Sequence, residues 1–294
     1  MHKFWRDKKV LFIGDSMTAR GQYPHVIEEM LGIQAFYHCK DGAHIVAMVD
    51  GERGLDGAYE EAPDILRPLT KEEVQDKDLI VLFGGYNNIL YGGYKGRSCA
   101  PGKPGDLYNP DGTGEDTIAG VMQYAINRIY EELAKADNAA CRLLIVTVDC
   151  TGKNQWLNAD GYSEFPPRSG KSYEKTAVIQ KAVAQRNGLP CCDLFHTSGI
   201  NPHTWCVFCA DAETLNREYT PYLLDEQGTV LSDEYLQYRH MESYYQIRDG
   251  KVVLEQYAGY APYPYNNDQL HKSPAGYRRI AEVVAGSMIA AYGI

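Results

Sequence analysis

The sequence lacks the long apolar runs that membrane-spanning segments need. No stretch of its 294 residues approaches the roughly 18 to 20 unbroken apolar residues of a membrane helix. Residues 1–9 are polar and lead directly into an apolar run, which argues against a targeting segment. We therefore expect no membrane partner.

Clusters of basic residues are also missing. Lys and Arg number 29 against 39 Asp and Glu, for a net charge of −10, and no basic run exceeds the Lys8-Lys9 and Arg278-Arg279 doublets. Binding to a phosphate backbone needs a basic stripe, because affinity comes largely from release of the counterions that surround the phosphates. We therefore expect no nucleic-acid partner. The oligomeric state does not follow from these numbers.

The cysteines do not form a disulfide framework. Eight are scattered along the chain, several of them inside apolar runs, where they act as small buried hydrophobic residues. A reducing cytoplasm is the simpler interpretation, although a secreted protein without its signal peptide would look the same. Cys206 and Cys209 are spaced for zinc or for a disulfide, with further candidate zinc ligands upstream at Cys191, Cys192, His196 and His203. One Cys-x-x-Cys pair is a weak ligand set, so we expect neither a metal nor another cofactor.

What the sequence does have is an alternation of short apolar runs and amphipathic helical patterns. The length suits one decorated domain, 1–294. The apolar runs predict buried strands at 9–13, 33–38, 78–83, 142–148 and 189–195, and the helical patterns lie at 18–31, 116–136, 172–186 and 273–292. This order predicts a three-layer α/β fold, with a parallel sheet covered by helices on both faces.

Three long connections follow predicted strands, at 92–115, 151–171 and 196–269. Ligands bind outside the carboxyl ends of strands in open α/β sheets, so elaboration there suggests a deep cleft. Within the third connection, Asp249-Gly250 predicts a hairpin turn between residues 246 and 253, and 222–231 is a second candidate hairpin. We interpret 196–265 as an inserted β-rich subdomain.

A candidate nucleophile lies directly after the first predicted strand. The segment Gly14-Asp15-Ser16-Met17-Thr18 opens the first helix, so Ser16 is placed at the carboxyl end of the strand, near the free N–H groups of a helix start. The alternative is that Ser16 is an ordinary helix N-cap. The Gly-x-Ser-x-Gly elbow of α/β-hydrolases is absent, since Thr18 stands where the second glycine would be.

A candidate base lies just before the last helix. Asp268 and His271 are three residues apart, close enough for the carboxylate to accept a hydrogen bond from one imidazole nitrogen while the other faces a serine. The alternative is a surface Asp followed by a His at the start of a helix. Taken alone, that alternative is the more common arrangement.

Two candidate oxyanion donors follow other strands. Asn87 comes after Gly84-Gly85 at the end of the third predicted strand, where its amide can donate to a developing oxyanion. Gly42 follows the second strand and offers an unhindered backbone N–H. An ordinary turn explains either residue alone. His44, two residues after Gly42, is more simply a solvent-facing loop histidine.

The four blocks, in this order, resemble the SGNH hydrolases, also called the GDSL esterase/lipase family. The resemblance implies a flavodoxin-like α/β fold, Ser16 as nucleophile, Asp268 and His271 as its partners, and an oxyanion hole formed by Ser16, Gly42 and Asn87. It covers residues 8–195 and 266–292. Asn88 departs from the family, which usually has Asp there, and this puts the local loop structure in question more than the activity.

The expected function is hydrolysis of a short-chain ester, such as acetyl, on a carbohydrate, through a Ser-His-Asp triad and an acyl-enzyme. The substrate would be a small-molecule or oligosaccharide ester. Ten of the 23 tyrosines lie between residues 218 and 265, and Tyr260 and Tyr263 come shortly before Asp268. Tyrosine rings suit the C–H face of a sugar, so we expect these two to bind substrate, unless the tyrosines merely pack the subdomain. Two alternatives remain: an acyltransferase using the same site, and a carbohydrate-binding protein with an idle site.

Overall fold

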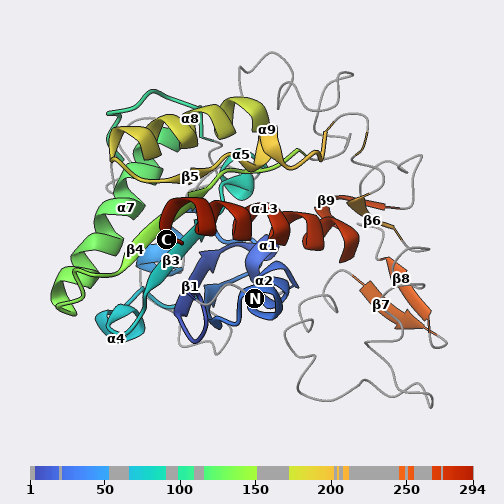
Figure 1. The fold of residues 1–294 in the computed structure, drawn as a ribbon. Helices are drawn as coiled ribbons and strands as arrows, with labels where there is room; N and C mark the ends of the chain where they lie inside the picture. The colour runs from blue at the N-terminus through green and yellow to red at the C-terminus, as the bar shows by residue number, and fades with distance from the viewer. Residues whose placement is uncertain are drawn as a thin grey trace.

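The computed structural model describes most of the predicted α/β core and short pieces of the long third connection. The described residues are 4–19, 22–52, 66–90, 99–108, 116–150, 172–201, 204, 208–211, 245–248, 251–254, 267–272 and 274–293. Figure 1 shows how the elements of these segments are arranged.

The core is a sheet of five parallel strands in the order β2-β1-β3-β4-β5. The strands are β1 (Lys9–Gly14), β2 (Gln34–Cys39), β3 (Leu79–Phe83), β4 (Arg142–Val146) and β5 (Cys191–Cys192). This is the flavodoxin-like order. The chain adds β2 on one side of β1 and then β3, β4 and β5 on the other side, so the topological switch point lies between β1 and β3. In the register of the sheet, Gly14 at the end of β1 pairs with Cys39 on one side and Phe83 on the other. The residues that follow these three strands therefore emerge at one edge.

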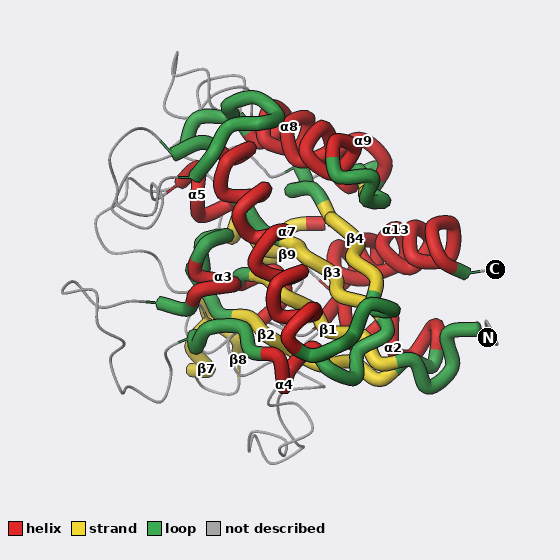
Figure 2. The backbone as a smooth tube through the Cα atoms, turned by 90° about the vertical axis from the view of Figure 1, so that its left-hand side faces the viewer, coloured by secondary structure: helices red, strands yellow, loops and turns green. Residues whose placement is uncertain are grey.

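Two pairs of helices cover the sheet. Helix α2 (Gln22–Leu31) packs against α13 (Pro274–Tyr292), and α7 (Ile118–Lys135) packs against α8 (Tyr173–Arg186). The chain crosses from β1 to β2 in one direction and from β3 to β4 in the other. Right-handed crossovers therefore put the two pairs on opposite faces (Figures 1 and 2). The predicted three-layer α/β fold is confirmed.

Local capping fixes where α7 and α8 begin. The Thr117 hydroxyl accepts a hydrogen bond from the N–H of Gly120 at 3.0 Å, and the Ser172 hydroxyl accepts one from Lys175 at 3.0 Å. Each bond satisfies an N–H that has no partner inside the helix. An unbroken apolar face then buries α7 against the sheet, with Ile118, Val121, Met122, Ala125, Ile126, Ile129 and Leu133 among its buried residues.

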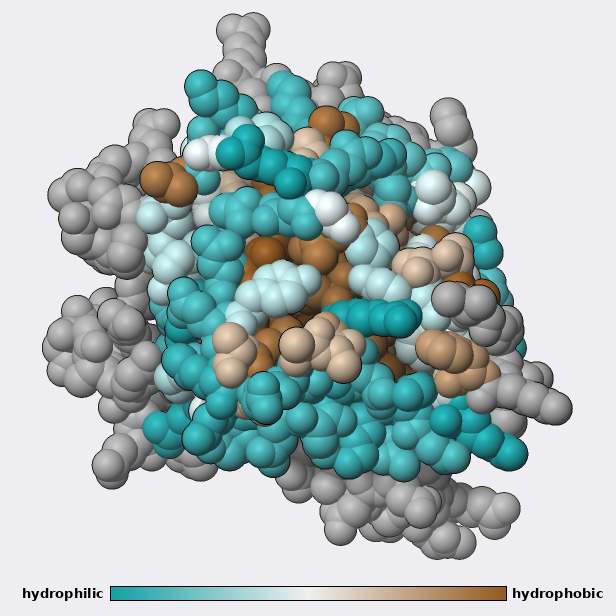
Figure 3. Space-filling view, turned by 60° about the vertical axis from the view of Figure 1, so that its left-hand side comes forward, coloured by the Kyte–Doolittle hydropathy of each residue, from teal (hydrophilic) through white to brown (hydrophobic). Residues whose placement is uncertain are grey.

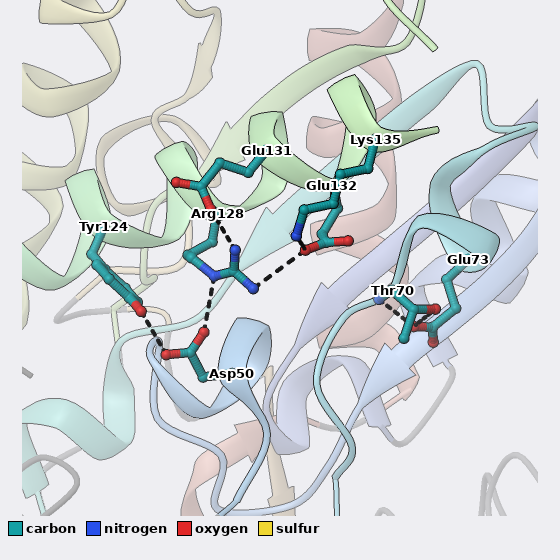
Figure 4. A network of polar contacts seen from close by, with 8 residues as sticks. All are labelled: Asp50, Thr70, Glu73, Tyr124, Arg128, Glu131, Glu132 and Lys135. Carbon is teal, nitrogen blue, oxygen red and sulfur yellow. Dashed lines mark hydrogen bonds and ion pairs between the residues drawn. The ribbon is translucent and has the colours of Figure 1, made fainter. Parts of the chain in front are cut away.

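A polar network ties α7 to the short helix α3 (Ala47–Asp50) (Figure 4). Asp50 accepts hydrogen bonds from Tyr124 Oη at 2.7 Å and from Arg128 Nε at 3.1 Å. Arg128 also bonds Glu131 and Glu132 on its own helix. A four-residue helix is too short to be stable alone, so these contacts help hold α3 in place.

Several predicted boundaries are wrong. The run 189–195 forms a strand only at Cys191–Cys192, because Leu194–Thr197 turns into the short helix α9. The helix predicted from residue 18 begins earlier, as α1 (Ser16–Ala19). Strand β2 is an edge strand and is not buried on both faces, since Tyr37 is 39% exposed. Neither α4 (Lys71–Val74) nor α5 (Tyr86–Leu90) was expected, since single turns leave little periodicity.

Two small antiparallel sheets lie outside the core sheet. Strand β7 (Tyr245–Arg248) pairs with β8 (Lys251–Leu254), which confirms the predicted hairpin around Asp249-Gly250. Strand β6 (Cys209–Asp211) pairs with β9 (Asn267–Lys272), where the sequence had predicted no strand. The hairpin expected at 222–231 lies outside the described residues, and the inserted subdomain at 196–265 stays a prediction.

The surface seen from the α7 side is mostly hydrophilic, with hydrophobic side chains visible near its centre (Figure 3). Within the described segments, none of the helices has the length and apolar character needed to cross a membrane.

Cys39, Cys141, Cys191 and Cys192 are free thiols, and burial raises the pKa of each, to about 12 for the first three and about 11 for Cys192.

Candidate active site

Ser16 is the first residue of α1 and is only 4% exposed. It does not cap the helix, because the preceding Asp15 does. The Asp15 side chain accepts a hydrogen bond at Oδ1 from the N–H of Met17 at 3.0 Å, and its backbone carbonyl accepts those of Thr18 and Ala19. The Ser16 hydroxyl is thus available for another partner.

The close approach of this turn to its neighbours explains why a glycine precedes it. A Cβ placed on Gly14 would lie 2.1 Å from the Thr18 hydroxyl and 2.6 Å from the backbone oxygen of Phe83. Any side chain there would push α1 away from the end of β3. Gly14 therefore keeps Ser16 close to the elements that follow β3.

The partner of Ser16 is His271. The two atoms Ser16 Oγ and His271 Nε2 lie 2.8 Å apart, at hydrogen-bond distance, and both side chains are buried. His271 lies in β9, which belongs to the small sheet with β6, just before α13. With the proton on Nδ1, the imidazole Nε2 accepts the hydrogen bond from the serine hydroxyl.

Asp268 lies in the same strand, three residues before His271, where its backbone pairs with that of Ala210. Its side chain lies outside what the structure describes. The contact expected between the Asp268 carboxylate and the His271 imidazole therefore stays a prediction.

The side chain of Asn87 contacts the residue that follows Gly42, and the oxyanion hole expected from these two donors stays a prediction. Asn87 is in α5, is 3% exposed, and donates from Nδ2 to the backbone oxygen of Ala43 at 3.1 Å. An amide nitrogen carries two hydrogens, so one N–H remains for a ligand. Gly42 is exposed and has a φ of +78°, a left-handed conformation that glycine adopts without strain.

Asn88, where the sequence departs from the family pattern, is a structural residue of this loop. Its side-chain oxygen accepts a hydrogen bond from the N–H of Ile45 at 3.1 Å, and its Nδ2 lies 3.7 Å from Cys99 Sγ. Its backbone oxygen accepts one from the N–H of Cys99 at 2.7 Å. The neighbouring residues Asn87 and Asn88 thus both hold the segment that follows Gly42.

Asp15 is a fully buried carboxyl group behind Ser16. Burial, helped by the charges of Asp41 and Asp149 and opposed by the hydrogen bond from Met17, raises its pKa to about 8. At neutral pH the group is therefore largely protonated. The side chain of Asp15 therefore adds little negative charge next to the hydroxyl of Ser16.

Sequence reasoning missed three residues at the same edge of the sheet. Asp149, three residues past the end of β4, is fully buried, and its carboxylate pairs with the Lys272 ammonium at 3.1 Å. Tyr86 donates a hydrogen bond from its hydroxyl to the same carboxylate. The rule that placed Ser16 and Asn87, a polar residue after a buried strand, also applies to Asp149.

His44 is half-buried, which corrects the expectation of a solvent-facing histidine. Burial lowers its pKa to about 4, against the charge of Glu52, and its Nδ1 has no hydrogen-bond partner among the described residues. The expected substrate-binding residues Tyr260 and Tyr263 lie outside the described residues, as does Cys206. In the part of the chain that is described, no group of three or more His, Cys, Asp or Glu side chains is placed to hold a metal ion.

Neither a protein-family model nor a curated protein matches this chain. Solved structures do match along nearly its whole length. One crystal structure is 18% identical, covering 98% of this chain and 99% of the other, with a TM-score of 0.51. A GDSL-like lipase from Bacteroides thetaiotaomicron is 14% identical, with 97% and 89% covered and a TM-score of 0.41.

A variant of an acetyl-xylooligosaccharide esterase from Geobacillus is 12% identical, with 98% of this chain and 95% of the other covered and a TM-score of 0.40. At such identities the likeness is one of fold alone. The chain therefore has the α/β fold that its resemblance to the SGNH hydrolases implied.

Proposed function

We propose that this protein is a serine-dependent carboxylic ester hydrolase. The observation that carries the proposal is the 2.8 Å contact between Ser16 Oγ and His271 Nε2 in a buried setting at the carboxyl edge of the sheet. A nucleophile and a base within hydrogen-bond distance form the minimal unit of nucleophilic catalysis by serine. The donors expected from Gly42 and Asn87 complete the arrangement.

In the acylation half, the Ser16 hydroxyl oxygen attacks the ester carbonyl carbon while His271 Nε2 takes the hydroxyl proton. The tetrahedral intermediate carries its negative charge on the former carbonyl oxygen. Its carbon–oxygen bond to the alcohol then breaks, and the imidazolium returns the proton to the leaving alcohol. Asp268 would hold the imidazole in the tautomer with the proton on Nδ1.

The negative charge of the intermediate needs fixed donors. The backbone N–H groups of Ser16 and Gly42 and the second N–H of Asn87 are the proposed donors. Asn87 is well suited, because its bond to Ala43 already fixes the orientation of its amide. A donor fixed before the reaction stabilises the charge without reorganising.

In the deacylation half, water replaces the alcohol. His271 takes a proton from the water as its oxygen attacks the acyl carbon, then passes that proton to Ser16 Oγ as the acyl–serine bond breaks. The products are the free acid and regenerated Ser16. A sugar hydroxyl in place of water would give the acyltransferase reaction.

For the substrate, we propose a short acyl group, such as acetyl, on a carbohydrate. The proposal rests on the tyrosine-rich segment before Asp268, which contains Tyr260 and Tyr263. Tyrosine offers an apolar ring face and a hydroxyl to a sugar, whereas a lipase would be expected to present Leu, Phe and Ile.

The experiment is a hydrolysis screen of p-nitrophenyl esters of increasing acyl length, beside acetylated oligosaccharides. We expect turnover to fall as the chain lengthens beyond short acyl groups and acetate to be released from the oligosaccharides. A preference for long chains would contradict the acetyl proposal. Absence of hydrolysis of every ester would contradict the function itself.

A further inference from the structure

A buried polar cluster links the strand that carries His271 to the helix that carries Asn87. Asp149 lies at its centre. Its Oδ2 is 3.1 Å from Lys272 Nζ, and its Oδ1 accepts a hydrogen bond from the Tyr86 hydroxyl. The Tyr86 oxygen in turn accepts a hydrogen bond from the N–H of Asp149 at 2.7 Å.

All three side chains are removed from water. Asp149 is 0%, Tyr86 1% and Lys272 2% exposed. Burial, together with the nearby Asp149 charge, raises the pKa of Tyr86, so its hydroxyl keeps its proton and remains a donor. A buried ion pair gives little net stability compared with apolar side chains, so stability alone does not explain why these residues are here.

Their places in the chain suggest another purpose. Lys272 directly follows His271 in β9, and Tyr86 directly precedes Asn87 in α5. Side chains of adjacent residues in a strand point to opposite sides, so His271 contacts Ser16 while Lys272 contacts Asp149. One carboxylate thus binds a neighbour of the proposed base and a neighbour of the proposed oxyanion donor.

Strand β9 lies outside the core sheet. It pairs with β6 in a two-stranded sheet and has no place among the five strands of the core sheet. The hydrogen bonds of the core sheet therefore do not set the position of His271. The ion pair from Lys272 to Asp149 is a direct tie between β9 and the segment that follows β4.

We propose that Asp149 is a positioning residue which, through Lys272 and Tyr86, holds His271 and Asn87 in the geometry that ester hydrolysis needs. This inference rests on the proposed function, since it assigns a purpose to groups around the same site. Among the described residues, the Asp149 carboxylate pairs with Lys272 and Tyr86 and not with Ser16 or His271. It acts through the two backbone segments that it joins.

The first test compares Lys272→Met, Asp149→Asn and the double variant, with p-nitrophenyl acetate as substrate. We expect each single variant to lose about 10- to 100-fold in kcat with KM little changed, because small displacements of reacting groups cost this much. The double variant removes both charges and should lose less than the product of the two single losses. It also remains measurable if a single buried charge prevents folding.

Glu132→Gln is the matched control. Glu132 is another carboxylate with little exposure, 5%, which pairs with Arg128 and Lys135 on α7. The Glu132→Gln variant should have a lower melting temperature than the wild type and an unchanged kcat. Equal losses of kcat in this control and in Asp149→Asn would overturn the positioning role, as would wild-type kcat in both single variants.

Tyr86→Phe tests the second arm. It should lower kcat in the wild-type background but have little further effect after Asn87→Ala, because the donor that Tyr86 positions is then absent. The same fold-loss in both backgrounds would overturn this arm.

The titration of the His271 imidazole, followed by NMR, tests the first arm without any turnover. Lys272→Met removes a neighbouring positive charge and leaves Asp149 uncompensated, and both changes favour the protonated imidazole. We expect the pKa of His271 to rise, and an unchanged value would overturn the link. If the wild-type protein hydrolysed no ester, the proposed function would fail while this measurement still decided whether the cluster acts on His271.

Discussion

The hydroxyl of Ser16 and Nε2 of His271 lie 2.8 Å apart although 255 positions separate the two residues in the chain. The first residue is fixed by the turn after β1, and the second by a strand that pairs only outside the core sheet among the described residues. Folding thus brings the proposed nucleophile and the proposed base into contact.

Replacing Ser16 by Ala should lower kcat for p-nitrophenyl acetate by about 10³-fold or more, because the covalent route is lost while the oxyanion donors remain. The measurement is steady-state hydrolysis, with circular dichroism to check that the variant is folded. Turnover close to wild type would rule out Ser16 as the nucleophile.

Replacing Asn87 by Ala should lower kcat by about 10²- to 10³-fold, since one donor to the oxyanion is removed. Asn88→Ala is the natural comparison, because Asn88 holds the same loop through Ile45 and Cys99. We expect Asn88→Ala to lower the melting temperature more than Asn87→Ala and kcat less. A change in KM alone after Asn87→Ala would remove it from the oxyanion hole.

Asp15 should make the stability of the protein fall as pH rises. Its pKa is raised from 3.8 to about 8 in the folded state, so between these values the folded protein keeps a proton that the unfolded chain releases. The contribution of Asp15 to the free energy of unfolding is complete below about pH 4. It is lost as pH rises toward 8, with a slope of at most about 1.4 kcal/mol per pH unit.

Asp15→Asn tests this, because an asparagine does not titrate and still accepts the hydrogen bond from Met17. Urea unfolding at several pH values from 5 to 8 should show the wild type losing stability relative to the variant as pH rises. Parallel pH profiles for the two proteins would show that Asp15 is ionised throughout.

No metal should be needed for hydrolysis, because Ser16 is the proposed nucleophile and His271 the proposed base. Activity should survive prolonged treatment with EDTA, and elemental analysis should find less than one zinc per chain. One tightly bound zinc per chain would overturn this prediction and make Cys206 and Cys209 the first candidate ligands to test.

Tyr260→Ala and Tyr263→Ala should weaken kcat/KM for an acetylated oligosaccharide while leaving p-nitrophenyl acetate nearly unchanged, because only the larger substrate would reach these rings. Equal losses on both substrates, with a lowered melting temperature, would favour a packing role for the two tyrosines.

The sequence by itself determined the framework of the fold. The apolar runs at β1, β3 and β4 predicted buried strands, and the helical patterns at 116–136 and 172–186 predicted α7 and α8. The sequence also placed Ser16, Gly42 and Asn87 directly after three predicted strands, because the carboxyl ends of parallel strands meet at one edge of the sheet. These signals are local, so they can be read without knowing which segments meet.

Tertiary structure decided the rest. The single-turn helices α3 and α5 are held by distant partners such as Arg128 and Asp149, and β9 exists because β6 pairs with it. The ion pair between Lys272 and Asp149 does not show in the hydrophobic periodicity of either segment. Such contacts depend on which parts of the chain burial brings together, and for that reason only the folded protein shows what holds His271 against Ser16.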